Sequence, residues 1–406
     1  MSSSLTRRSF TTAATVAALP MSAAPKKRVA AIVTEYRRMS HADVIVGRML
    51  EGYSPNNRRI EPRTQIVSMY TDQVPANDMS RDMAKKHGFP IYPTIGEALT
   101  LGTGKLSVDA VLFVGEHGDY PRNEKGQKMY PRYELFQKIV EVFREQRRSL
   151  PLFSDKHLSY SWEYAERMYR ESRELKFPFM AGSSIPVTVR YPELELPLGT
   201  KVNKGVVVGY GDLDAYGFHT LESLQCMVER RGKGETGVGS VQWIEGPEVW
   251  KWRDGPGAWS APLLEESLRR NAEQGTVAEG RMEDKVKQPV VFLVRYRDGL
   301  EAAAYMLQGF ARGWSVALDV EGSARPASCH FGSPEKLRPL AHFDGLVHCI
   351  EEMFVTGKPP LPIERTLLTT GTLAFLFDSR MARKQLDTPA LAISYRPFRD
   401  TFFQRS

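Results

Sequence analysis

Residues 27–53, KRVAAIVTEYRRMSHADVIVGRMLEGY, decide the fold of this chain. The stretch opens with a short apolar run rich in β-branched residues, VAAIV at 29–33, which is typical of a strand buried on both faces. A polar segment follows, and apolar residues then recur at helical spacing from Val44 to Leu50. The pattern predicts a strand, a turn and a helix. In many α/β domains this unit holds the phosphates of a dinucleotide at the helix N-terminus.

The turn between this strand and helix, TEYRRMSH at 34–41, contains no glycine. A fingerprint of the form G-x-G-x-x-G relies on glycine because the backbone must approach the pyrophosphate closely. Arginine and serine side chains, together with the amides of the helix N-terminus, can still meet a pyrophosphate at a greater distance. Dinucleotide binding therefore stays open at this stage. The residues of the turn expected to contact a dinucleotide are Thr34, Arg37, Arg38, Ser40 and His41.

Strand and helix patterns alternate along residues 25–182, which predicts a Rossmann-like, doubly wound parallel sheet. Ligands bind such sheets where the strands end, so residues that follow the strands should share one rim. Further strands are expected at 64–70, 108–114, 150–153 and 177–182, and helices at 77–87, 95–101, 133–147 and 161–175. The rim is predicted to carry the turn at 34–41, Asp72, Glu116, His117 and residues 155–157.

From residue 183 the pattern changes, and residues 183–406 are predicted to form an α+β domain with a mainly antiparallel sheet. The dipeptide Asp298-Gly299 between two strand patterns is a hairpin signal. Strands are expected at 204–211, 237–244, 290–297, 300–307 and 314–320, and helices within 212–231 and at 337–354 and 363–383. We expect this domain to serve substrate binding or oligomerisation.

Residues 1–24 are predicted to be an export signal rather than part of the fold. TRRSF at 6–10 is a twin-arginine pair followed by an aromatic residue, and an Ala/Thr-rich run then leads to small residues at the cleavage end. The alternative is a disordered basic tail. The export signal predicts a periplasmic or extracellular location. Because the twin-arginine route moves folded proteins, any cofactor is expected to bind before export.

Composition excludes several classes of partner. Of 406 residues, 42% are hydrophobic and 25% are charged, with a formal net charge of +7. Basic residues are dispersed among acids, so we do not expect nucleic acid as a partner, and no apolar stretch after the signal is long enough to predict membrane insertion. Cys226, Cys329 and Cys349 lack the spacing of a metal site and are expected as free thiols, with one disulfide as the alternative.

The order of these elements resembles the glucose–fructose oxidoreductase / inositol dehydrogenase / MocA (Gfo/Idh/MocA) family. Three stretches carry the resemblance: VDAVLFV at 108–114, PLFSDKH at 151–157, and residues 342–383, which are similar to the family's closing segment. The resemblance implies a dinucleotide-binding first domain, with NAD or NADP as the cofactor, and a second domain built on an open sheet. A small carbohydrate or polyol is the implied substrate.

The resemblance also implies roles for individual residues. Lys156 keeps the place of a lysine near the nicotinamide and the substrate, whereas Asp155 and His157 stand where the family has Glu and Pro. His219 matches a histidine that accepts a proton from the substrate hydroxyl, and Asp214, one residue farther away than is usual, would orient it. A surface lysine and a helix-capping histidine are the plain structural alternatives.

Three more rim residues receive roles in the same way. His117 is a second acid/base candidate, and Glu116 beside it follows the strand that lines the nicotinamide pocket. Asp72 follows the second strand, where an acid commonly holds the adenine ribose, with a turn residue as the alternative. These histidines and carboxylates do not have the close spacing that is typical of metal ligands, so no metal site is predicted.

One aromatic stretch, WIEGPEVWKWRDGPGAW at 243–259, has no counterpart in the resemblance. It contains four of the six tryptophans of the chain. It is expected as a loop, whose tryptophans offer platforms for sugars, fasten the loop to the core, or mediate contacts in a homo-oligomer.

The sequence therefore predicts an exported oxidoreductase that acts on a sugar or polyol with tightly held NAD(P). Two alternatives stay open. One is a cofactor-free relative that binds a glycan or a protein, which the missing glycines favour. The other is a non-redox sugar lyase, in one version dependent on a metal ion.

Overall fold

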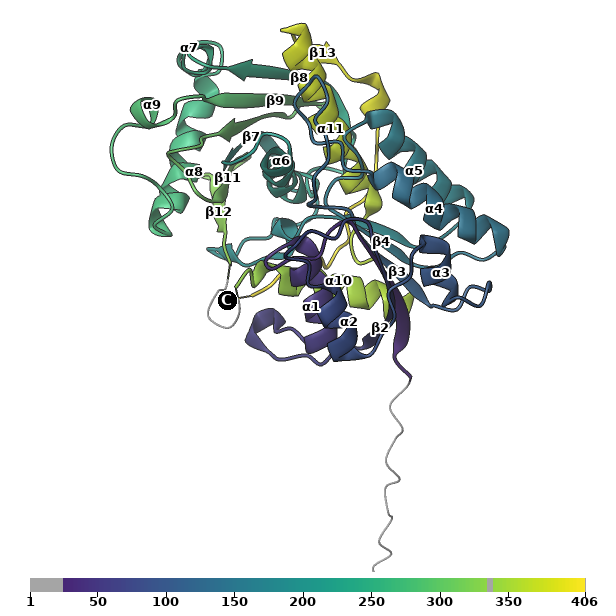
Figure 1. Cartoon of the computed structure of the whole chain (residues 1–406). Helices are drawn as coiled ribbons and strands as arrows, with labels where there is room; N and C mark the ends of the chain where they lie inside the picture. Colours follow the sequence, from purple (N-terminus) through teal and green to yellow (C-terminus); the bar gives the residue numbers. More distant parts are fainter. Residues whose placement is uncertain (1–24, 334–338, 406) are drawn as a thin grey trace, which may run out of the picture.

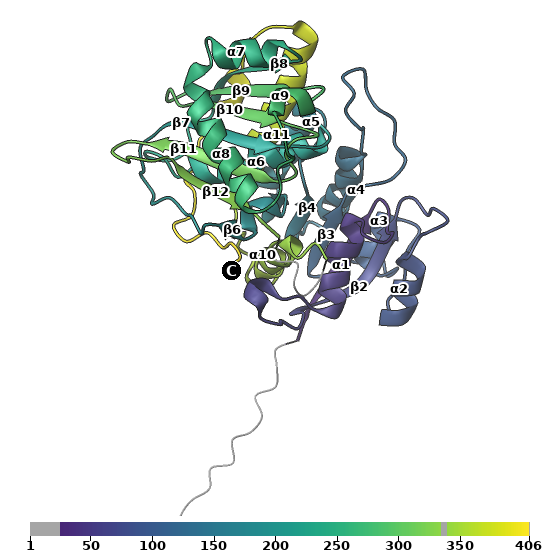
Figure 2. The same cartoon turned by 90° about the vertical axis from the view of Figure 1, so that its left-hand side faces the viewer.

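The computed structural model describes residues 25–333 and 339–405. The expected export signal, residues 1–24, lies outside the described residues, as do the first two residues of the helix expected at 337–354. Figures 1 and 2 show the chain as two sheets with helices on their faces, the first sheet at the lower right of Figure 1.

The first sheet has five parallel strands in the order β2-β1-β3-β4-β5, as the alternation of strands and helices predicted. Because the strand order changes direction between β1 and β3, the ligand crevice of such a sheet is expected above these two strands. The strands are β1 (Lys27–Val33), β2 (Thr64–Thr71), β3 (Ala110–Val114), β4 (Leu152–Asp155) and β5 (Phe179–Gly182).

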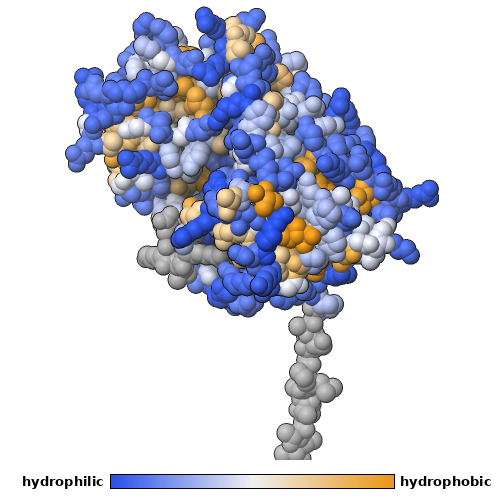
Figure 3. Space-filling model, viewed as in Figure 1, coloured by the Kyte–Doolittle hydropathy of each residue, from blue (hydrophilic) through white to orange (hydrophobic). Residues whose placement is uncertain are grey.

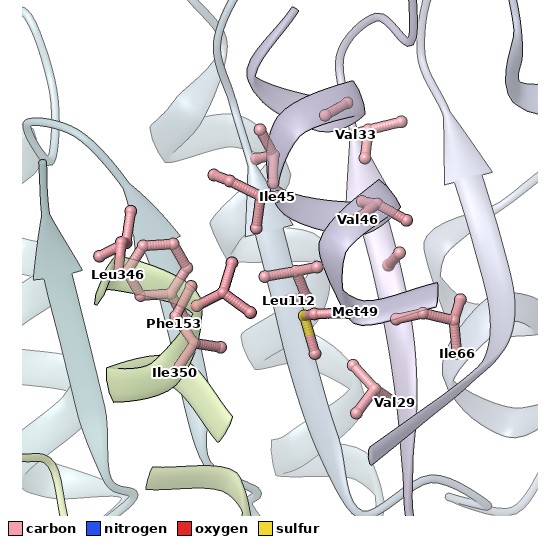
Figure 4. Packing of buried hydrophobic residues seen from close by; sticks show 14 of the residues in the cluster. Val29, Val33, Ile45, Val46, Met49, Ile66, Leu112, Phe153, Leu346 and Ile350 are labelled. Carbon is pink, nitrogen blue, oxygen red and sulfur yellow. The ribbon is translucent and has the colours of Figure 1, made fainter. Parts of the chain in front are cut away.

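Helices cover both faces of this sheet because its strands are apolar on both sides. Val29 and Val33 of β1 face one core, and Ala30 and Ile32 face the other. Figure 4 shows Ile45 and the residues beside it on the first helix packed against these strands. The first core is covered by α1 (His41–Glu51), α2 (Ser80–His87) and α10 (His342–Thr356), and the second by α3 (Ile95–Thr100), α4 (Arg132–Glu145) and α5 (Trp162–Glu174).

Helix α10 comes from the far end of the chain but packs on the first sheet (Figure 4). Buried ion pairing fastens it there. Asp344 accepts a hydrogen bond from the guanidinium of Arg48 on α1, and both side chains are buried. Glu351 accepts the hydroxyl of Tyr53 at 2.8 Å and the backbone N–H of Thr64 at 2.9 Å. The chain therefore returns to the first sheet after completing most of the second.

The second sheet has eight strands in the order β13-β8-β9-β10-β7-β11-β12-β6. It is mainly antiparallel, as predicted, and the hairpin at Asp298-Gly299 joins β9 to β10. The exception is β10, which runs parallel to β7. The strands are β6 (Arg190–Tyr191), β7 (Val202–Gly209), β8 (Val238–Glu245), β9 (Val290–Tyr296), β10 (Glu301–Met306), β11 (Trp314–Val320), β12 (Ala327–Phe331) and β13 (Leu386–Asp387).

Helices α6 (Ala215–Val228) and α11 (Ile363–Ala382) pack on one face of this sheet, and α7 (Glu248–Asp254) and α8 (Ala261–Glu273) on the other. Figure 2 shows α8 in front of the strands. A one-turn helix, α9 (Met282–Lys285), follows α8. Short 3-10 turns are η1 (Pro55–Asn57), η2 (Ile185–Val187), η3 (Ala258–Ser260) and η4 (Pro389–Leu391).

Three expectations about local structure were wrong. The helix expected at 337–354 begins at His342, after a turn at 339–341. The helix expected at 77–87 begins at Ser80, because the Asp78 carboxylate accepts the backbone N–H of Ser80 at 3.1 Å and closes a turn before it. The aromatic stretch 243–259 is not a loop: it contains the end of β8, helix α7 and η3. Trp250, Trp252 and Trp259 pack on the outer face of the second sheet.

The three cysteines are free and buried, as the sequence predicted. Among the described residues, no helix is both long and apolar enough to cross a bilayer. Figure 3 shows a mostly hydrophilic face on which apolar residues form small separate groups.

Glu222 on α6 gives a test of this packing. Its carboxylate is buried and accepts the backbone N–H of Ser183 at 2.7 Å, and burial raises its pKa to about 7. An unfolded glutamate ionises near pH 4.3, so the unfolded state is stabilised relative to the folded state, and the folded protein loses stability, as the pH rises from about 4.5 to 7. We expect Glu222→Gln to remove this loss, which is on the order of 3 kcal/mol at pH 8 and absent at pH 4.

Denaturant unfolding followed by circular dichroism at the two pH values measures the difference. Glu134→Gln on the exposed face of α4 removes the same charge and serves as the matched control. An equal effect of Glu222→Gln at both pH values would contradict the prediction.

Candidate active site

A cleft of about 760 Å³ lies between the rim of the first sheet and the second sheet. Its lower wall is formed by residues that follow β1, β3 and β4, and by the start of α10. Its upper wall is formed by the start of α6 and by the ends of β11 and β12. The cleft is thus at the carboxyl edge of the parallel strands, where the sequence placed the functional rim.

Four non-glycine residues that line the cleft have left-handed backbone conformations, and one of them is Leu340 (φ 55°), just before α10. The other three are Met39 (φ 62°), His117 (φ 68°) and Lys156 (φ 54°), one in each loop that follows β1, β3 and β4. Residues with a Cβ seldom adopt this conformation, and such strain is concentrated at functional sites when the surrounding structure enforces it. The backbone therefore marks the same rim as the side chains do.

Glu116 is the buried charge at the centre of the lower wall. Lys156 Nζ lies 2.8 Å from its Oε1, and the guanidinium of Arg132 donates to its Oε2. The two cations hold the pKa of Glu116 well below its usual range despite its complete burial. Lys156 and Glu116 are thus brought together as the rim prediction required, and Lys156 presents a buried ammonium group to the cleft.

Arg132 was missed by the sequence analysis. It is the first residue of α4, is fully buried, and also lies 3.2 Å from Nε2 of His157 through Nη1. The sequence offered one indication of this role, because Arg132 begins a helix that follows a long loop at the rim. Arginines in such positions are usually exposed to solvent.

Five of the eight histidines line this one cleft. Burial, the largest cause, lowers the pKa of four of them: His219 to well below its usual range, His117 and His342 to about 3, and His330 to about 4. These four imidazoles are therefore neutral near pH 7. A neutral imidazole offers one donor and one acceptor nitrogen, which suits recognition of hydroxyl groups.

Several buried polar atoms around the cleft have no hydrogen-bond partner within the described residues. Nε2 of His117 and Nδ1 of His219 are two of them, and both side chains line the cleft. Oδ1 of Asp155 and Oδ1 of Asp214 are two more. Because buried polar groups are normally satisfied, this concentration indicates a site for a polar ligand or ordered water.

Aromatic rings form the upper wall. Tyr216 stacks on Trp314 with ring centroids 5.5 Å apart at 26°, and His219 lies edge-on to Trp314 at 5.4 Å. Trp314 Nε1 donates to the hydroxyl of Thr220 at 3.1 Å, which fixes the indole. An aromatic face is a natural platform for the apolar face of a sugar. Sequence patterns offered a sugar platform at residues 243–259 as one of three alternatives and did not point to Trp314, because a lone tryptophan at the start of a strand carries no such signal.

Asp214 and His219 lie near each other but do not form the expected pair. Asp214 accepts the backbone N–H of Lys128 at 3.2 Å, and its Oδ1 lies 4.0 Å from Nε2 of His157. The described residues include no hydrogen bond between Asp214 and His219, whose Nδ1 has no partner. Burial and the nearby Asp212 raise the pKa of Asp214 to about 6.

The turn after β1 is occupied by hydrogen bonds among its own residues. The Ser40 hydroxyl caps α1 by accepting the N–H of Asp43 at 3.3 Å and that of Arg37 at 3.2 Å. The Asp43 carboxylate accepts the N–H of Met39 at 2.8 Å, and Glu35 forms an ion pair with Arg37. Three amides near this helix N-terminus, those of Arg37, Met39 and Asp43, therefore already have side-chain acceptors, one of which is a carboxylate.

Thr34 and Asp72, two other predicted contacts of a dinucleotide, are also bonded within the chain. Thr34 Oγ1 donates to the carbonyl of Glu116 at 2.8 Å, which joins the loops after β1 and β3 across the crevice. Asp72 accepts the hydroxyl of Tyr70 at 2.9 Å and that of Tyr120 at 2.7 Å. Arg38 is exposed and does not line the cleft.

The ring of His41 lines the cleft, and Met39 is the other residue of the turn that lines it. Nδ1 of His41 lies 2.7 Å from Oδ2 of Asp155, the last residue of β4.

Among the described residues, no group of three or more His, Cys, Asp or Glu side chains has the arrangement of a metal site.

The sequence and the structure of this chain were compared with those of known proteins. No protein-family model matches the chain, and no curated protein sequence matches it. Solved structures do match. Myo-inositol 2-dehydrogenase from Lactobacillus plantarum is similar over 89% of this chain and 99% of its own, with 10% identity and a TM-score of 0.53.

Two further structures agree. GenD2 from gentamicin A biosynthesis, solved in complex with NAD, has 13% identity, covers 91% of this chain and 99% of its own, and has a TM-score of 0.54. Scyllo-inositol dehydrogenase from Lactobacillus casei has 10% identity, covers 89% and 98%, and has a TM-score of 0.55. This chain has the two-domain Gfo/Idh/MocA fold. Identities this low show the fold, so substrate and chemistry rest on the cleft.

Proposed function

We propose that the protein is an enzyme that converts a sugar or polyol in this cleft by proton transfer at hydroxyl groups. The observation that carries the proposal is the pair of unpartnered imidazole nitrogens, on His117 and His219, in the same cleft as the Lys156–Glu116 ion pair. Hydroxyl groups can donate to and accept from such nitrogens. The structural neighbours that are inositol dehydrogenases support a polyol as substrate.

The chain's own residues have separable tasks in this proposal. The Lys156 ammonium donates to a substrate hydroxyl, and Glu116 keeps that ammonium in position. The neutral imidazoles of His117 and His219 hydrogen-bond to further hydroxyls. The Tyr216–Trp314 wall packs against the apolar face of the ring.

Hydride transfer to NAD or NADP is the form of this proposal that the fold supports, since one structural neighbour was solved with NAD. Such a cofactor would accept or supply the hydride, with its nicotinamide near Lys156, Glu116 and His117. The phosphate and adenosine ends do not fit. Ser40 and Asp43 already accept hydrogen bonds from three amides of the turn, and two phenols donate to Asp72. The residues that the structure brings together therefore support proton transfer in the cleft and do not by themselves support a bound dinucleotide.

The self-bonded turn supports a second form, in which the enzyme works without a dinucleotide and catalyses a non-redox reaction such as elimination. Both forms use the same cleft and the same hydroxyl-binding residues and differ in the need for a dinucleotide, so an experiment on dinucleotide binding separates them.

We expect no dinucleotide to be retained by the purified full-length protein, because the groups that would contact one are bonded to each other. Absorbance spectra and mass spectrometry of the denatured protein measure retention, and calorimetric titration with NAD and NADP measures binding. Retained or tightly bound NAD(P), weakened by Arg37→Ala, would establish the oxidoreductase form and refute this expectation.

The aromatic wall predicts sugar binding directly. We expect Trp314→Leu to weaken binding of a cyclic polyol such as myo-inositol several-fold, since aromatic packing contributes about 1 kcal/mol. Calorimetry against a panel of sugars and polyols measures the change. Trp250→Leu, on the far side of the second sheet, is the matched control and should leave affinity unchanged. Binding that never leads to conversion would instead favour a glycan-binding protein.

We also propose that the protein is exported by the twin-arginine route, which the sequence at residues 6–10 supports. The full chain should appear in the periplasmic fraction of a bacterial host that has this pathway. Replacing Arg7 and Arg8 with lysine should abolish that appearance while leaving the cytoplasmic level intact. Unchanged fractionation would refute the proposal.

A further inference from the structure

The first residue of α1 and the last residue of β4 form a carboxylate–imidazole pair at the rim. Nδ1 of His41 lies 2.7 Å from Oδ2 of Asp155. The Asp155 side chain is 0% exposed, whereas that of His41 is 13% exposed and lines the cleft. The Ser40 cap fixes the start of the helix and thereby the position of His41.

This arrangement determines which ring nitrogen of His41 carries the proton. An ionised carboxylate only accepts hydrogen bonds, so Nδ1 of a neutral His41 must be the N–H nitrogen. Nε2 is then the acceptor, and it makes no hydrogen bond to any described residue. The buried carboxylate also stabilises the imidazolium that forms when Nε2 takes up a proton.

The other histidines of the cleft lack this support. Within the described part of the chain, no carboxylate is hydrogen-bonded to His219, and burial together with Lys156 lowers its pKa well below the usual range. Nδ1 of His117 lies 3.3 Å from the guanidinium of Arg37, and its pKa falls to about 3. A proton on either ring would be held poorly, so these residues are suited to hydrogen bonding rather than to accepting a proton.

We propose that His41 is the general base of the cleft and that Asp155 is its positioning residue. The assignment rests on the proposed function, and it replaces two sequence-based roles: His41 as a phosphate contact and His219 as the proton acceptor. In the step, a proton leaves a substrate hydroxyl or an acidified C–H and binds to Nε2. The same proton then passes from Nε2 to the product or to water, so no proton is gained or lost by the enzyme.

Neighbouring groups hold the His41 ring in place. Phe343 of α10 lies edge-on at 5.0 Å between ring centroids, and His117 lies edge-on at 5.2 Å. Charged or titratable groups around the ring come from every adjoining element: Asp155 and Lys156 from β4 and its loop, Glu116 and His117 from the loop after β3, His219 from α6 and His342 from α10. Asp155 is the carboxylate that is hydrogen-bonded to the ring.

The test needs no knowledge of the substrate. Nitrogen-15 labelling of histidine in the full-length protein reports the tautomer of each ring, and His41→Gln identifies the His41 signals. We expect the Nδ1–H tautomer in the parent protein and the Nε2–H tautomer, or a mixture, in Asp155→Asn, because the amide can donate to Nδ1. An Nε2–H tautomer in the parent protein overturns the proposal.

Diethyl pyrocarbonate, which acylates unprotonated imidazole nitrogens, gives a second measurement. Peptide mass spectrometry should show His41 as the fastest-reacting histidine of the cleft, and roughly tenfold slower reaction in Asp155→Asn. His348→Gln on α10, outside the cleft, is the control and should leave the reactivity of His41 unchanged. Thermal melting of each variant excludes unfolding as the cause. Equal reactivity of His41 with and without Asp155 also overturns the assignment.

Once a polyol substrate is found, His41→Gln should lower kcat by about a hundredfold or more with little change in KM. A polyol that binds without conversion refutes the proposed function but leaves the tautomer result standing. Conversion that survives His41→Gln refutes the general base alone. The two failures are therefore distinguishable.

Discussion

The ion pairing of Glu116 is the interaction on which the cleft depends. A fully buried carboxylate is stable only with partners, and Lys156 and Arg132 supply two. Those partners come from the loop after β4 and the start of α4, so one charge joins three segments of the rim. The left-handed conformation of Lys156 is maintained in this setting, because its ammonium group is bound and its backbone N–H donates to Gly182 at 3.2 Å. The neutral histidines are arranged around this paired charge.

The turn after β1 shows how one fold position changes its chemistry. A glycine turn leaves amides free for a phosphate, whereas here Ser40, Asp43 and the Glu35–Arg37 pair use the available groups locally. The first helical residue, His41, is then free to face the cleft and to pair with Asp155. The fold of a dinucleotide domain is retained because strand and helix packing does not depend on the turn.

Sequence patterns predicted the parallel sheet and the rim well, because carboxyl ends of parallel strands must meet at one edge. Glu116, His117 and Lys156 were placed on the cleft for that reason alone. Arg132 and Trp314 were missed, since each becomes part of the site only through contacts with segments remote in sequence. The Asp214–His219 pair, implied by resemblance, is not formed, because Asp214 is directed to Lys128 and His157 instead.

The sequence by itself determined which loops carry the chemistry-bearing residues, because apolar periodicity predicts the parallel sheet and the strand ends of that sheet form one rim. It also determined that glycine is absent from the turn. Only the tertiary structure decided what each side chain pairs with. His41 and Asp155 are 114 residues apart, and Arg48 and Asp344 are 296 apart. A hydrogen bond forms or fails according to differences of a few tenths of an ångström in the donor–acceptor distance. Tertiary packing sets that distance, and the local sequence pattern does not encode it.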